Sequence, residues 1–177
     1  MQGNVLKKVL ALIVAIIMVT TISVSAYDLI GWHLYLKSAS FTWGDRLQTS
    51  GSVIRDAWED AINDWDDACS ANFYYNSSAI SELNSNYEDS DDVFGSINVT
   101  RNYDDSLAYF FANINAGNIH IGEDNVARSA ANHELGHALG LADIRSGRAI
   151  MNTRRDRNSI YKPQTDDLNG VAAIYGD

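Results

Sequence analysis

The sequence predicts an α+β fold in which a twisted sheet of four to five strands packs against a long helix, a second helix and a C-terminal helix. Apolar and polar residues alternate over residues 30–37, which is typical of a half-buried strand. Apolar residues then recur at helical spacing over residues 53–65, with Asp and Glu between them. Short apolar stretches farther along, separated by Asn, Asp and Gly, indicate the remaining strands.

The other expected elements follow from local patterns. Ser52 is a favourable N-cap for the long helix, and Gly140 is a favourable end for the second helix because glycine accepts a positive φ. The polar and acidic run over residues 84–92 has no periodicity, so we expect a loop there. We expect further strands at residues 97–99, 107–112 and 118–121, the second helix from Asp124 or Asn125 to Gly140, and the last helix after Thr165.

Residues 1–26 have the pattern of a secretory signal peptide. Lys7 and Lys8 precede an apolar run over residues 9–19, and small residues end the segment at Ala26. The run is shorter than the roughly 20 apolar residues of a membrane-spanning helix, so an uncleaved anchor is the weaker alternative. We therefore expect a secreted, extracellular protein that leaves the membrane after cleavage, with one domain over residues 27–177.

Composition narrows the class of protein. The 177 residues carry a net charge of −10, and loss of the two lysines of the leader makes it −12. This excess of acid argues against nucleic acid or an anionic membrane as the main partner. The single cysteine, Cys69, has no partner for an internal disulfide and is interpreted as a small buried residue. A domain of this size buries a sufficient core by itself, so we expect a monomer.

The segment over residues 133–143 carries the chemistry. His133 and His137 are four residues apart, so on a helix they project from the same face. Neutral imidazoles suit zinc, and a zinc ion with three protein ligands keeps a fourth position for water. Glu134 stands beside the first histidine, where it can take a proton from that water and act as the catalytic residue.

The third metal ligand comes from the chain beyond the helix. Gly140 can end the helix and turn the chain back, which would bring the carboxylate of Asp143 to the metal. Asp156 is the alternative, but its flanking arginines are more typical of a solvent-exposed loop. We predict one catalytic zinc ion held by His133, His137 and Asp143. The alternative to a metal site is a helix that carries two histidines by coincidence.

This motif resembles the zinc signature of the metzincin metallopeptidases, His-Glu-x-x-His-x-x-Gly-x-x-His/Asp. Residues 149–152, Ala-Ile-Met-Asn, resemble the methionine turn of that clan, with Met151 as the structural methionine beneath the metal. Residues 164–176 are similar to the final helix of matrixins, and residues 107–121 to the strands that border their substrate cleft. The resemblance implies a metzincin-type twisted mixed sheet and a zinc-dependent endopeptidase.

Several positions depart from the matrixin pattern. Asp143 stands where matrixins have a third histidine, as in the snapalysin group, and Tyr109 replaces a histidine that binds a structural zinc. The resemblance therefore implies one zinc ion, with His120 on the surface of the sheet. Matrixin calcium sites lie just after the position of His120, and Glu123 and Asp124 are present here, so calcium is a further candidate cofactor.

The expected partner is a protein or peptide substrate in extended form. We expect it to pair with an edge strand near residues 113–118. The motif does not distinguish a protein from another amide, so a zinc hydrolase of a cell-wall peptide is one alternative. A secreted, zinc-stabilised binding module without turnover is the other, although Glu134 weighs against it because structural zinc sites usually have four protein ligands.

The charge is distributed unevenly. Residues 128–162 contain seven basic and three acidic side chains, a local charge of +4 within an acidic protein. A basic rim around the predicted site would favour acidic or neutral peptides at low salt, and screening would weaken that preference.

Overall fold

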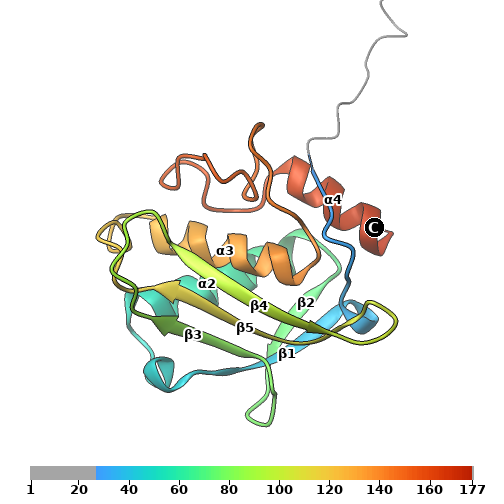
Figure 1. Ribbon diagram of the computed structural model, residues 1–177, viewed down its shortest axis with the longest axis horizontal. Helices are drawn as coiled ribbons and strands as arrows, with labels where there is room; N and C mark the ends of the chain where they lie inside the picture. Colours follow the sequence, from blue (N-terminus) through green and yellow to red (C-terminus); the bar gives the residue numbers. More distant parts are fainter. Residues whose placement is uncertain (1–26, 177) are drawn as a thin grey trace, which may run out of the picture.

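A computed structural model describes residues 27–176, and the predicted signal peptide lies outside them. Within this range five strands form one mixed sheet in the order β2-β1-β3-β5-β4 (Figure 1). Three neighbouring pairs are parallel, and β4 runs antiparallel to β5 at one edge. The strands are β1 (Ser38–Trp43), β2 (Asn72–Tyr75), β3 (Glu82–Asn86), β4 (Gly95–Arg101) and β5 (Leu107–Asn115).

Three α-helices accompany the sheet in this part of the chain: α2 (Val53–Ala68), α3 (Val126–Ala138) and α4 (Thr165–Tyr175). Helices α2 and α3 pack against each other and against the same face of the sheet, whereas α4 lies beyond α3 (Figure 1). The predicted α+β class and sheet size are confirmed. No helix within residues 27–176 is both long and apolar enough to cross a membrane.

Helix α2 supplies much of the core, as its pattern predicted. The Ser52 hydroxyl accepts a hydrogen bond from the backbone N–H of Arg55 at 3.1 Å, which caps the helix. Trp58 and Trp65 on its apolar face are fully buried against the sheet and α3. The Trp65 indole donates to the Asn132 carbonyl of α3 at 3.1 Å, so the helix that carries the predicted site is fixed to the core.

The first strand lies later than the sequence predicted. Residues 30–37 do not form a strand, and β1 begins at Ser38 after a 3-10 turn over Tyr35–Lys37. Leu36 and Lys37 adopt φ values of 51° and 57°, which interrupt an extended chain. The alternation changes phase at this point, from even positions up to Leu36 to odd positions from Ala39. The first run instead packs as an irregular segment, in which the Ile30 N–H donates to the Gly140 carbonyl.

Three predictions around the second half of the sheet were also wrong. Asn84 to Asn86 belong to β3 and not to a loop, and residues 118–121 form turns in place of a strand. The edge is not formed by residues 113–118, because β5 lies between β3 and β4. Single-sequence periodicity does not reveal which strand has a free side, so β4 was not recognised as the edge.

The C-terminus of α3 is fixed by two distant segments. The Trp32 indole donates to the His137 carbonyl at 2.9 Å, and the Tyr175 hydroxyl of α4 donates to the Leu139 carbonyl at 2.9 Å. Gly140 then takes a φ of +100°, as predicted, and a Cβ there would lie 2.3 Å from the Trp32 carbonyl oxygen. Only glycine fits this turn, for both its conformation and its contact with the backbone.

We expect Gly140→Ala to lower the free energy of unfolding by about 3 kcal/mol, because left-handed strain and a backbone clash act together. Gly51→Ala is the matched control, since Gly51 has a φ of +89° and open space around its Cβ position. The control should cost about 1 kcal/mol, the strain alone. Chemical denaturation measures both variants, and equal losses would contradict the role of the close contact.

Candidate active site

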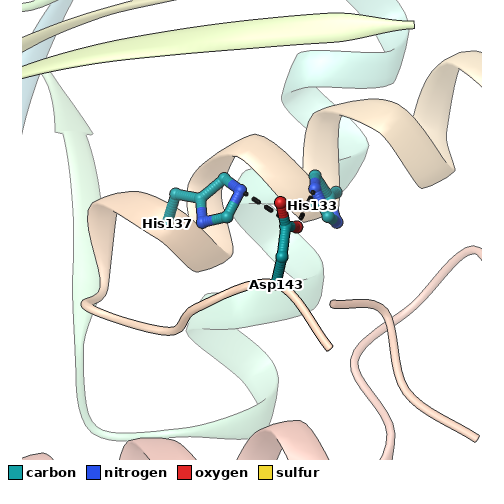
Figure 2. A group of neighbouring side chains, drawn as sticks. All are labelled: His133, His137 and Asp143. Atoms are coloured by element: carbon teal, nitrogen blue, oxygen red, sulfur yellow. Dashed lines mark ion pairs between the residues drawn. The ribbon is translucent and has the colours of Figure 1, made fainter. Parts of the chain in front are cut away.

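Helix α3 and the loop after it bring together the three predicted metal ligands. His133 and His137 lie one turn apart on α3, with their ring centroids 4.7 Å apart. The Nε2 atoms lie 3.1 Å and 3.5 Å from Oδ1 of Asp143, which returns from the loop to face both rings (Figure 2). All three ligand atoms lie within 4.8 Å of one another, close enough to share one metal ion.

The backbone orients both imidazoles for metal binding. Nδ1 of His133 lies 3.0 Å from the carbonyl oxygen of Ile150, and Nδ1 of His137 lies 2.8 Å from that of Leu141. A carbonyl oxygen only accepts, so Nδ1 carries the proton and each Nε2 directs its lone pair toward Asp143. Two neutral nitrogens and one carboxylate are a donor set that suits zinc, and the residues therefore fit the ion that the motif predicts.

The local charges favour a divalent cation. Burial lowers the pKa of His133 to about 4, which keeps its imidazole neutral. Burial acts on His137 as well, but the neighbouring carboxylates of Asp143 and Glu134 outweigh it and raise the pKa of this imidazole. The two adjacent imidazoles hold the pKa of Asp143 well below its usual range, so this carboxylate is ionised.

Glu134 is buried between α3 and the start of β4. Its side chain approaches the sheet where β4 begins, and a Cβ at Gly95 would lie 2.8 Å from Oε1 of Glu134. Glycine at this position therefore makes room for the carboxylate. Burial raises the pKa of Glu134 to about 7, so this group can exchange a proton near neutral pH.

Met151 lies beneath the helix that carries the histidines. It is 2 % exposed, and a Cβ at Gly136 would lie only 2.4 Å from its sulfur. Gly136 stands between the two histidine turns, so the absence of a side chain there lets the methionine approach α3 closely. Apolar packing thus supports the ligand face from below, and Ile150, the preceding residue, supplies the carbonyl that orients His133.

A residue that sequence reasoning missed, Asp167, fixes this turn. Its carboxylate is 1 % exposed and accepts from the N–H groups of Ile150 at 2.7 Å and Met151 at 3.1 Å. It also accepts from the Gln164 N–H at 2.8 Å, as part of the capping box of α4. The sequence signal for the cap was visible at the start of the last helix, but the contact with the distant turn was not.

Two arginines after the methionine turn were also missed as part of the site. Arg155 is buried and donates to Ser129 Oγ at 2.9 Å, to the Ser129 carbonyl at 2.8 Å and to the Asn152 carbonyl at 3.1 Å. Burial lowers its pKa to about 9. Its Nη1 also lies 3.3 Å from Nδ1 of His133. Arg157 is half-buried and stacks over Phe94.

Other candidate positions lie elsewhere. Asp156 accepts from Ser159 Oγ and the Asn158 N–H, away from the three ligand atoms. His120 lies in a turn and not on the sheet, with Nδ1 2.5 Å from Glu123 Oε1. Glu123 also accepts from Asn158, and calcium binding at Glu123 and Asp124 stays a prediction.

Comparison with known proteins identifies the family. The sequence model of the matrixin family matches residues 40–176, which include four strands and most of β1, the helices α2, α3 and α4, and the three converging residues. The chain belongs to the matrixin family. It is therefore a zinc metalloendopeptidase whose substrates are peptides. No curated protein matches the chain significantly. Asp143 lies with His133 and His137 in a group that could hold a metal ion.

Asp167→Asn should loosen the methionine turn, because the amide NH₂ group would face a backbone N–H where the carboxylate accepts a hydrogen bond. We expect a loss of about 2 kcal/mol in the free energy of unfolding. Zinc affinity should fall by roughly tenfold, because His133 loses its fixed carbonyl partner. Chemical denaturation and zinc competition measure the two effects. Asp156→Asn, in an exposed turn, is the control, and equal behaviour of the two variants would refute the role of Asp167.

Proposed function

We propose that this chain is a secreted zinc endopeptidase in which His133, His137 and Asp143 hold the catalytic ion and Glu134 moves the proton. The single observation that carries the proposal is the convergence of two oriented Nε2 atoms and one ionised carboxylate beside a buried glutamate. When bound, zinc would supply a Lewis acid that polarises the scissile carbonyl and acidifies the attacking water.

The residues of the chain perform the remaining tasks. Glu134 takes a proton from the attacking water and delivers it to the leaving amine, acting first as base and then as acid. The Ile150 and Leu141 carbonyls keep both imidazoles in the tautomer that presents Nε2. Asp167 and Gly136 act through the turn at Met151, which they hold against α3.

The edge strand β4 offers a binding place for an extended peptide. One side of β4 pairs with β5, and within residues 27–176 no strand pairs with its other side. A peptide that adds to this free edge would form main-chain hydrogen bonds. It would pass Gly95 and therefore Glu134. This arrangement explains how a peptide bond could be presented to the site without any fixed side-chain requirement.

Glu134→Gln should lower kcat/KM by on the order of a hundredfold or more, because the amide cannot accept the proton. Zinc content should stay close to that of the wild type, since the three ligands are unchanged. The measurement is cleavage of an unfolded protein with metal analysis of the same sample, before and after a zinc chelator and after zinc is restored. Undiminished, chelator-insensitive cleavage by the variant would exclude this mechanism.

The proposal of secretion rests on the leader pattern of residues 1–26. The chain is packed from its first described residues, since the Asp28 carbonyl accepts from the Ala142 N–H and a Cβ at Gly170 would contact Tyr27. A cut after Ala26 would therefore remove the leader and leave the packed segment whole. N-terminal sequencing of protein from the culture medium should give Tyr27. Retention of the full chain in the membrane fraction would count against a cleaved signal.

A further inference from the structure

An arginine that forms no ion pair within residues 27–176 lies close to the proposed proton carrier, Glu134. Arg157 is half-buried, and its Nε is buried with no hydrogen-bond partner among residues 27–176. The guanidinium makes no ion pair with that part of the chain, and Glu134 is the acidic group whose charge acts on it most clearly. A partly desolvated guanidinium without a paired carboxylate is costly, so this position is suited to an anion from outside the chain.

Arg157 is placed where a substrate would pass. Its guanidinium carbon lies 3.6 Å from the ring centroid of Phe94, the residue that precedes β4. The next residue, Gly95, touches Glu134. The ring lies against the guanidinium, and its two Nη groups make no hydrogen bond within residues 27–176, so they can donate to a carboxylate. Arg155 cannot take this part, because its N–H groups are committed to Ser129 and Asn152.

The chemistry of the proposed reaction fixes which substrate residue meets Arg157. Glu134 must reach the leaving nitrogen to deliver its proton, so the residue that carries the new amino group lies on the Glu134 side of the scissile bond. Arg157 approaches Glu134, because it contacts Phe94 and a Cβ at the next residue, Gly95, would meet the Glu134 side chain.

We propose that Arg157 is a specificity-determining residue that binds a carboxylate on the substrate residue immediately after the scissile bond, so that the protein prefers Asp or Glu at this position. The inference rests on the proposed function and deepens it by naming a substrate class. Within the basic segment 128–162, the proposal assigns substrate recognition to Arg157 alone. Arg155, two residues earlier, is buried and has a structural role.

Two peptides that differ only by Glu or Gln after the scissile bond test the proposal. The wild type should cleave the Glu peptide with a kcat/KM about tenfold higher or more, as expected for a charge-assisted hydrogen bond. In Arg157→Gln the ratio should fall to about one, and in Arg157→Lys it should be partly restored because the charge returns. Arg154→Gln, an exposed arginine of the same loop, should keep the wild-type ratio. Salt should reduce the wild-type preference.

A binding measurement separates this proposal from the proposed function. Calorimetry with Glu134→Gln protein should show tighter binding of the Glu peptide than of the Gln peptide, and Arg157→Gln in the same background should remove the difference. The proposal would be overturned if the wild type cleaved both peptides with the same kcat/KM. It would also be overturned if the preference for the Glu peptide remained in Arg157→Gln. Absence of zinc-dependent cleavage would instead overturn the proposed function, and the calorimetric difference would still decide whether Arg157 binds a carboxylate.

Discussion

Gly140 turns the chain back over the end of α3, and the order of the whole site follows from this turn. Its φ of +100° and its contact with the Trp32 carbonyl admit no side chain. The turn sends the Leu141 carbonyl to His137 and the carboxylate of Asp143 to both imidazoles. A helix alone would present two histidines to solvent. The reversal supplies both the hydrogen bond that orients one ring and the third ligand atom.

The opposite side of the site depends on a single buried carboxylate. Asp167 at the start of α4 accepts hydrogen bonds from the turn that contains Ile150 and Met151. The same turn directs the Ile150 carbonyl to His133 and packs Met151 against Gly136. The same carboxylate closes the capping box of α4. Formation of the last helix and orientation of the first metal ligand are therefore linked through one side chain, although 34 residues separate His133 from Asp167.

Of the two arginines near Glu134, one is held by hydrogen bonds within the fold and the other can bind a substrate. Arg155 is enclosed by backbone and hydroxyl acceptors, which offset much of the cost of burying its charge. Arg157, two residues later, lies against the ring of Phe94 and has no hydrogen-bond acceptor within the described part of the chain. The sequence around the two arginines does not distinguish them. They differ because the folded loop places hydrogen-bond acceptors next to Arg155 and not next to Arg157 within the described residues. The same holds for Asp156 and Asp143, of which one caps a surface turn and the other faces the histidines.

The sequence by itself determined the elements whose signals are local: α2 with its Ser52 cap, α3 with its histidine face and glycine end, and α4. It also determined the candidate ligands, because four-residue spacing on a helix fixes a shared face and glycine permits the return of Asp143. Tertiary structure decided the rest. The first strand begins at Ser38 because the chain must break where its alternation changes phase, and β4 is the edge because pairing partners are set by distant segments. Contacts between segments far apart in the sequence give Asp167, Arg155 and Arg157 their roles. No local sequence pattern indicates those contacts.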